Sequence, residues 1–198
     1  MAKVSLDLIQ QLRDRTSMGM MDCKKALEES AGDMEKAVEI LRKKGASVAA
    51  KRGDNATAQG LVHAYIHPGG LVGVLVELNC ETDFVASSDA FKSFAQDLGM
   101  HIAALSPLCV TPEQLDTSYV DNEKRIMREQ LEAEGKKGDF IEKILEGKVK
   151  KLYTDVCLLQ QKFVKNDKIT VDEALKELIG KVGENIKIRR FARFHIGA

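Results

Sequence analysis

LVGVLVELNCETDFVASSDAFKSFAQDLGMHIAAL, residues 71–105, is the stretch that decides the fold. Glu77 is the only charged residue between positions 71 and 78, and a run of aliphatic and β-branched residues after a Pro-Gly-Gly turn is typical of a buried strand. We therefore place this strand at the centre of a sheet. The segment that follows predicts a helix that covers the sheet, because its apolar residues recur at steps of three and four. These residues are Phe91, Phe94, Ala95, Leu98, Ile102 and Leu105.

An acidic turn separates this strand from this helix. Glu81, Thr82 and Asp83 place two carboxylates and a hydroxyl where a buried element has just ended and unpaired N–H groups need oxygen acceptors. Phe84 and Val85 follow at once. We expect an aromatic ring at such a junction to be held outward on a stiff support.

Residues 5–45 predict three short helices, because their apolar residues follow three helical stripes. Gly32 can take the left-handed position after the second helix, Asp33 can cap the third, and Gly45 can end it. A bundle of this size buries little core, so we expect it to depend on the rest of the chain or on a partner.

The loop between the first two helices is unusual. Residues 16–21, TSMGMM, hold three of the seven methionines. Soft, adaptable methionine side chains on a loop favour a protein-binding surface. The alternative is that Met18 or Met21 packs into the bundle.

Residues 51–60 are polar and rich in turn formers, which predicts a linker. Residues 61–67 alternate in polarity and predict a strand that forms an antiparallel hairpin with the central strand. His63 and His67 share a face of that strand, but no third ligand is near, so we do not expect a metal site.

The chain changes character after Leu105. Residues 111–114, TPEQ, predict the start of a helix with a hydroxyl cap, and residues 112–134 carry seven acidic and three basic side chains. A lysine-rich helix follows, and we expect its charged face to be solvated and to pair with the acidic helix. The alternative is a phosphate contact, from lysines 148, 150 and 151. Residues 156–164 show no clear pattern.

The C-terminal part predicts one more helix and one more strand. Residues 170–173, TVDE, form a capping box, and Gly183 can close the helix that they begin. Residues 186–196 alternate, which predicts a third strand with a mostly basic outer face.

Composition excludes several classes of function. Thirty basic and thirty acidic side chains cancel, so no global field attracts nucleic acid or a membrane. The first residues, MAKVSLDLIQQL, do not resemble a leader, and no apolar run approaches the roughly 20 residues that span a bilayer, so we expect a cytoplasmic protein. The cysteines at 23, 80, 109 and 157 lack zinc-site spacing, and we expect reduced packing residues, although a bridge between chains through Cys109 or Cys157 stays open.

The motifs of common enzymes are missing from the sequence. Gly180-Lys181 is followed by Val182, so no GxxxxGK[ST] loop exists, and GxGxxG, HExxH and GxSxG are absent as well. We therefore expect a binding protein that has no cofactor, is not an enzyme and does not itself bind nucleotide.

Two of the segments above resemble one known family. Residues 13–27, RDRTSMGMMDCKKAL, and residues 79–85, NCETDFV, are similar to translation elongation factor Ts, the guanine nucleotide exchange factor of elongation factor Tu. The similarity continues through residues 100–104, MHIAA, and 183–190, GENIKIRR, and so covers most of the chain.

The resemblance implies a fold and a site. The fold is α+β: an N-terminal three-helix bundle of the ubiquitin-associated type (1–52), a linker (53–60), and a core of a three-stranded antiparallel sheet packed with helices (61–198), which also serves dimerisation. The bundle docks on the GTPase domain of elongation factor Tu, and the ring at the acidic turn wedges in beside its nucleotide and magnesium. The implied contacts are Arg13, Met20, Met21, Cys23, Lys24, Arg52, Thr82, Asp83, Phe84, Val85 and His101. Periodicity alone would place His101 in the core, seven residues after Phe94.

Some members of the family carry two copies of the core module, whereas this chain has one hairpin and one TDFV. A homodimer could supply the missing contacts, with Phe191 as one interface residue. Two rival functions are an adaptor that uses the bundle alone and an RNA-binding module that uses the basic strand and helix.

Overall fold

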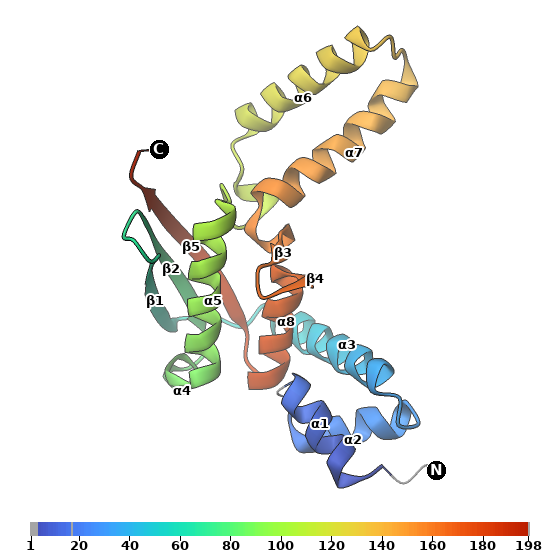
Figure 1. Ribbon diagram of the computed structural model, residues 1–198, viewed down its shortest axis with the longest axis vertical. Helices are drawn as coiled ribbons and strands as arrows, with labels where there is room; N and C mark the ends of the chain where they lie inside the picture. The colour runs from blue at the N-terminus through green and yellow to red at the C-terminus, as the bar shows by residue number, and fades with distance from the viewer. Residues whose placement is uncertain (1–3, 17, 198) are drawn as a thin grey trace. The chain divides into compact units, whose positions relative to one another are not determined.

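The computed structural model describes residues 4–16 and 18–197 (Figure 1). Its elements are α1 (Leu6–Thr16), α2 (Met20–Glu29), α3 (Met34–Arg52), β1 (Gln59–Ile66), β2 (Val72–Cys80), α4 (Asp83–Ser87), α5 (Asp89–Leu105), η1 (Pro112–Gln114), α6 (Thr117–Ala133), α7 (Asp139–Val156), η2 (Leu158–Gln160), β3 (Lys162–Phe163), β4 (Asn166–Thr170), α8 (Val171–Val182) and β5 (Ile186–His195). The predicted α+β class, with N-terminal helices before a core of sheet and helices, is confirmed.

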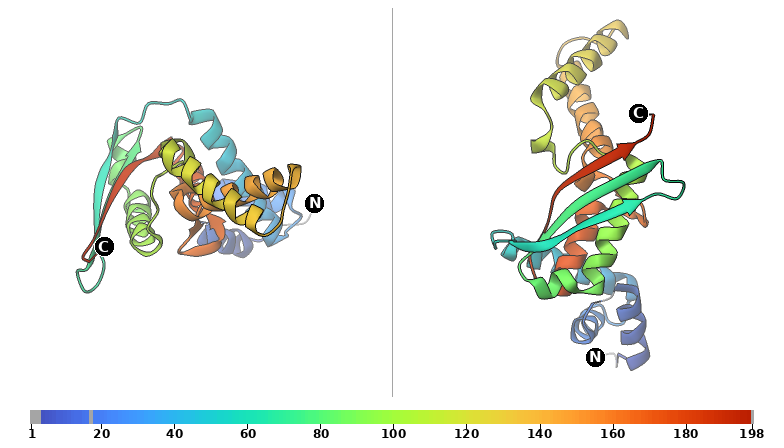
Figure 2. Two further views of the ribbon diagram at one scale, coloured as in Figure 1. Left: turned by 90° about the horizontal axis from the view of Figure 1, so that it is seen from above. Right: turned by 90° about the vertical axis from the view of Figure 1, so that its left-hand side faces the viewer.

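The three long strands form one antiparallel sheet in the order β1-β2-β5, so the strand predicted to be central is central. Every second residue of β2 from Val74 to Cys80 is buried, which gives the sheet one covered face. The right view of Figure 2 looks onto the sheet with α5 behind it. The predicted apolar residues of α5 are buried except Leu105, which ends the helix and is 45% exposed.

The chain divides into two compact units. Unit 1 consists of Met1–Val62, Leu78–Ala95 and Asp172–Lys187, and unit 2 of His63–Glu77, Gln96–Val171 and Ile188–Ala198. The N-terminal bundle thus belongs to the same unit as the acidic turn and α8. The expected domain borders at residues 52 and 60 stay a prediction.

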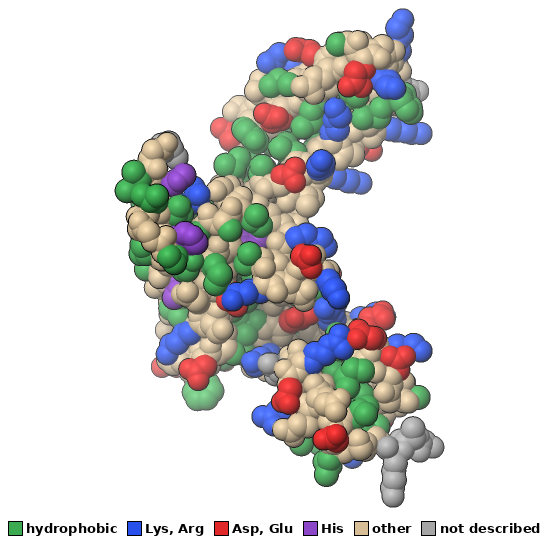
Figure 3. Space-filling model, viewed as in Figure 1, with side chains coloured by type: hydrophobic (Ala, Val, Ile, Leu, Met, Phe, Trp, Pro, Cys, Tyr) green, Lys and Arg blue, Asp and Glu red, His purple; other side chains and the backbone are tan. Residues whose placement is uncertain are grey.

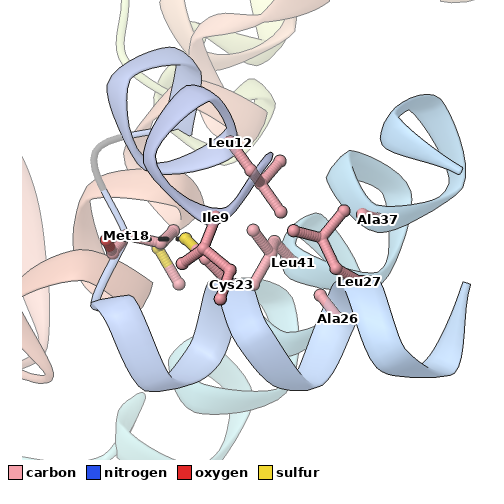
Figure 4. Packing of buried hydrophobic residues seen from close by; sticks show 8 residues of the cluster. All are labelled: Ile9, Leu12, Met18, Cys23, Ala26, Leu27, Ala37 and Leu41. Atoms are coloured by element: carbon pink, nitrogen blue, oxygen red, sulfur yellow. Dashed lines mark hydrogen bonds between the residues drawn. The ribbon is translucent and has the colours of Figure 1, made fainter. Parts of the chain in front are cut away.

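In unit 1, helices α1, α2 and α3 enclose a small core (Figure 4). Its residues are Ile9, Leu12, Met18, Cys23, Ala26, Leu27, Ala37 and Leu41. Asp33 caps α3 as predicted, because its carboxylate accepts the backbone N–H of Lys36 at 3.1 Å. Of the two methionines weighed as core residues, Met18 is buried and Met21 is exposed.

The prediction that Gly45 ends α3 is wrong, since the helix continues to Arg52. A Cβ atom on Gly45 would lie 2.9 Å from the carbonyl oxygen of Lys176, and one on Gly180 would lie 2.7 Å from the Cα of Gly45. Gly45 therefore allows α3 and α8 to cross at close distance instead of ending the helix. Helix α3 thus takes in residues 51 and 52 of the polar stretch 51–60 and ends where the implied linker, 53–60, begins.

In unit 2, the segment after α5 departs from the prediction at its start. Residues 112–114 form only a 3-10 turn, and α6 begins at Thr117, where Asp116 accepts the N–H of Ser118 at 2.9 Å. The predicted hydroxyl cap at Thr111 is therefore wrong. Helices α6 and α7 pack together as expected, with an ion pair of 2.7 Å between Arg128 and Glu142.

The unassigned stretch after α7 forms η2 and the short antiparallel pair β3-β4. The backbones of Cys109 and Cys157 pair as an isolated parallel β-bridge beside this stretch. Their sulfur atoms are 3.5 Å apart and form no disulfide. Both thiols are free and buried, and burial raises the pKa of Cys157 to about 12. Their burial argues against a bridge between two chains.

The predicted basic outer face of β5 holds only near the start of the strand, where Lys187, Arg189 and Arg190 are exposed. Arg190 pairs with Glu77 at 2.6 Å, and Glu77 lies between buried residues of β2, so it faces the uncovered side. Arg193, three residues further along β5, instead donates to the carbonyl oxygen of Ala103 in α5. The alternation of β5 thus changes phase after Ile188, which turns Phe194 outward with 66% of its surface exposed.

Candidate protein-binding site

The acidic turn is held by a capping residue with two sets of partners. Thr82 precedes α4, and its Oγ1 accepts the N–H of Val85 at 3.3 Å. The same hydroxyl donates to Glu184 at 2.7 Å, and the backbone N–H of Thr82 donates to the other oxygen of Glu184 at 3.0 Å. The hydroxyl therefore uses both its donor and an acceptor lone pair.

Phe84 is the second residue of α4 and is 82% exposed, so the prediction of an outward ring is confirmed. Asp83 is exposed beside it, whereas Val85 is buried. A single exposed aromatic is common on protein surfaces. The unusual feature here is a support that fixes the residues on either side of the ring.

Glu81, immediately before the turn, holds several donors. Its carboxylate accepts Nη1 of Arg52 at 3.0 and 3.1 Å, Nδ2 of Asn55 at 3.0 Å and the backbone N–H of Asn185 at 2.6 Å. The N–H of Asn185, followed by these side chains, holds the pKa of Glu81 below its usual value. The predicted contact residue Arg52 is thus already engaged within unit 1, with 42% of its side chain exposed.

The N-terminal bundle supplies a second group of predicted residues, also in unit 1. Arg13, Met20, Met21 and Lys24 are exposed, and Lys24 forms a loose ion pair of 3.8 Å with Glu28. They lie on α1 and on the first half of α2. These side chains offer apolar and cationic surface to another protein.

His101 belongs to unit 2 and has no exposed surface. Its Nδ1 accepts the N–H of Val164 at 3.2 Å, so Nε2 carries the proton and donates to Oε1 of Gln161 at 2.9 Å. Burial lowers the pKa of His101, although the bond to Gln161 opposes this effect. The imidazole is therefore neutral and ties α5 to the β3-β4 hairpin.

Three of the predicted contact residues, Cys23, Val85 and His101, are buried. Their direct contact with a partner stays a prediction, and their burial favours a supporting role. The sequence places Glu81 in the acidic turn, but it does not reveal Glu184 and Asn185 as parts of the site. Residues 184–185 lie in a segment that carries the family resemblance, but no local pattern shows that they bond to residues more than 100 positions away.

The two histidines weighed as a metal pair have other partners. His63 Nε2 lies 2.7 Å from Gln96 Oε1, and His67 Nδ1 lies 3.0 Å from the hydroxyl of Tyr65. Among the residues that the structure describes, no group of three His, Cys, Asp or Glu side chains is placed to hold a metal ion. Within the same residues, no helix has the length and hydropathy needed to cross a bilayer.

The fold is an α+β chain with an exposed aromatic on a turn fixed by hydrogen bonds and with exposed methionines on its N-terminal bundle, a surface of the kind suited to binding another protein. The family model of elongation factor TS matches residues 6–197. Elongation factor Ts of Carboxydothermus hydrogenoformans is 53% identical over 98% of this chain and 89% of its own length, and that of Fervidobacterium nodosum is 50% identical over 98% and 99%. Elongation factor Ts of Leptospira biflexa is 52% identical over 98% of both chains.

These matches cover nearly the whole chain, and the chain belongs to the elongation factor Ts family. It is therefore a translation elongation factor, and protein biosynthesis is the process in which it acts.

Proposed function

We propose that this chain is a guanine nucleotide exchange factor that binds elongation factor Tu and promotes GDP release. The observation that carries the proposal is Phe84, exposed beside Asp83 on a turn that hydrogen bonds fix on both sides. The ring enters the GTPase domain near the nucleotide, and the carboxylate and the turn disturb the contacts to magnesium and phosphate. The process would place the chain in the cytoplasm.

Such an exchange needs no covalent chemistry. A factor that binds the nucleotide-free GTPase more tightly than the loaded GTPase weakens nucleotide binding by the same factor, because the coupling between two ligands is reciprocal. Burial of one Phe side chain is worth roughly 1.5 to 3 kcal/mol, which corresponds to about one to two orders of magnitude in affinity. The ring alone can therefore weaken nucleotide binding by about one to two orders of magnitude.

The N-terminal bundle is the anchor in this proposal. Arg13, Met20, Met21 and Lys24 share its surface, and the bundle belongs to the same compact unit as the turn. Methionine-rich surfaces adapt their shape to a partner, and arginine is frequent among residues that dominate binding. The anchor holds the complex while the wedge acts.

Isothermal calorimetry with nucleotide-free and GDP-loaded elongation factor Tu tests this proposal. We expect the chain to bind the nucleotide-free form at least about tenfold more tightly, as the reciprocal coupling requires. Equal affinities for the two forms would contradict the exchange function, and an affinity that is undiminished after removal of residues 60–198 would favour the adaptor. Binding to RNA that falls steeply with added salt would favour the RNA-binding module. Figure 3 gives little support for the latter, because acidic and basic side chains are intermingled over α6 and α7 on the face it shows.

We also propose a homodimer formed through the outer face of the sheet in unit 2. A groove of about 590 Å³ lies there, and Ile66, Leu71, Leu75, Phe194 and Ile196 line it with exposed apolar side chains. Figure 3 shows hydrophobic side chains gathered at this end of the sheet. Phe191, the residue first considered for the interface, is half-buried, and Phe194 takes its place. Sedimentation of the wild type against Phe194→Asp tests the dimer, and equal masses for the two would contradict this interface.

A further inference from the structure

Two successive residues of the connection between α8 and β5 bind two successive residues of the acidic turn. The carboxylate of Glu184 accepts both the N–H and the hydroxyl of Thr82, at 3.0 and 2.7 Å. The N–H of Asn185 donates to the carboxylate of Glu81 at 2.6 Å. All four residues belong to unit 1.

The C-terminal end of α3 joins the same network. Asn185 is 3% exposed and donates its amide group to the carbonyl oxygens of Gly53 and Asn55, at 3.2 and 2.8 Å. Arg52 bonds to both oxygens of Glu81, so each of these oxygens has two donors. The turn is thereby tied to the residues before β1 and to the residues before β5.

We propose that Glu184, Asn185 and Arg52 are positioning residues that set the efficiency of exchange through Phe84. This proposal rests on the exchange function proposed above. A wedge on a mobile loop must be ordered when it binds, and that ordering reduces the binding free energy available for displacing the nucleotide. The network orders the turn in advance. Arg52 accordingly acts through Glu81 rather than by direct contact with the GTPase.

Glu184 is the best residue to change, because its only hydrogen bonds in this network are those to Thr82. When Glu184 is replaced, Thr82 can still accept the N–H of Val85 and so keep its capping role. The test measures the release of fluorescent GDP from elongation factor Tu by stopped flow, as a function of the concentration of each variant. With Glu184→Ala we expect the maximal release rate to fall about three- to tenfold, which corresponds to the typical net contribution of one hydrogen bond. We expect the concentration for half-maximal release to change by less than about twofold, because the anchoring bundle is intact.

A double variant shows whether Glu184 acts through the ring. In the Phe84→Ala background, Glu184→Ala is expected to have no further effect on the maximal rate, since residues that act as a unit are not additive. Effects that multiply in the double variant would overturn the proposal. So would a Glu184→Ala variant with the maximal rate of the wild type.

Controls separate positioning from folding and from the exchange function itself. Glu184→Gln keeps one acceptor and is expected to lie between Glu184→Ala and wild type, and it replaces Glu184→Ala if that variant does not fold. Glu129→Ala removes an exposed carboxylate that pairs with Arg125 in α6, and it is expected to behave as wild type. If the wild type itself fails to accelerate release, the proposed function is wrong. If the wild type accelerates release and the Glu184 variants release GDP at the same rate, the exchange function stands and the positioning role alone is wrong.

Discussion

Replacement of Phe84 by Ala removes the ring that the proposed exchange mechanism inserts into the GTPase. The side chain is 82% exposed in the free chain and contributes little to the core, so we expect the free energy of unfolding to change by less than about 0.5 kcal/mol. In the complex, the ring would be buried, at a gain of roughly 1.5 to 3 kcal/mol. Since 1.4 kcal/mol is a factor of ten, the accelerated rate of GDP release should fall about 10- to 150-fold.

The assay for Phe84→Ala is stopped-flow release of fluorescent GDP from elongation factor Tu at saturating concentrations of the variant. Phe140→Ala is the matched control, because Phe140 is also a largely exposed phenylalanine in the first turn of a helix, 57% exposed in α7. We expect the control to release GDP at the wild-type rate. Urea unfolding of both variants checks that the fold is intact.

The result for Phe84→Ala that would refute this reasoning is a release rate within about twofold of wild type with the fold intact. Burial of the Phe84 ring in the complex would then not contribute to the acceleration of GDP release. In that case Phe84 would not act in nucleotide exchange, and the acceleration of GDP release would have to come from the contacts of the N-terminal bundle.

Three further predictions address the anchor, the packing and the pH dependence. Arg13→Ala should weaken the complex with nucleotide-free elongation factor Tu about tenfold by calorimetry, as for an arginine at the centre of an interface, and an unchanged affinity would count against the anchor. Gly180→Ala should lower the free energy of unfolding in urea by about 1 to 3 kcal/mol because its Cβ would lie 2.7 Å from α3, while Gly147→Ala, with open space around it, should be neutral or stabilising by up to about 1 kcal/mol. The pKa of His101 is lower in the folded than in the unfolded chain, so the unfolded state takes up a proton first as the pH falls. The free energy of unfolding should therefore fall as the pH drops below about 6.5, and His101→Asn should make it less dependent on pH. If the free energy of unfolding of His101→Asn changes with pH as steeply as that of the wild type between about pH 7 and pH 5, the lowered pKa of His101 is wrong.

The central part of the fold could be predicted because its signals are local. The apolar run of β2, the capping hydroxyl of Thr82 and the helical period of α5 each depend on residues within a few positions of one another. The outward direction of Phe84 follows from the same local pattern. For this reason the position of the ring and its exposure can be predicted from the sequence alone.

The errors come from contacts that bring distant segments together. Gly45 has the properties of a helix stop, but its missing side chain allows α3 and α8 to cross at close distance. The same two helices are joined by a hydrogen bond between Arg42 and Glu177, which are 135 positions apart in the sequence. The bonds from Glu184 and Asn185 to the acidic turn span 102 and 104 positions. A single sequence offers no periodicity from which such pairs can be found.

The outer face of the sheet shows a third kind of limit. Strict alternation along β5 predicts one apolar and one basic face, yet the phase changes after Ile188 and places Phe194 on the uncovered side. A shift of one residue exchanges the two faces completely. Alternation alone thus makes Phe191 a candidate for the exposed face of β5, whereas Phe191 is half-buried and Phe194 is the exposed phenylalanine of this strand.

The most direct test of the exchange function is the rate of GDP release from elongation factor Tu at increasing concentrations of the wild-type chain. We predict that the rate rises and then saturates, because release occurs from a complex of the two proteins. A rate that stays at the spontaneous value at every concentration, while binding is detected by calorimetry, would contradict the account.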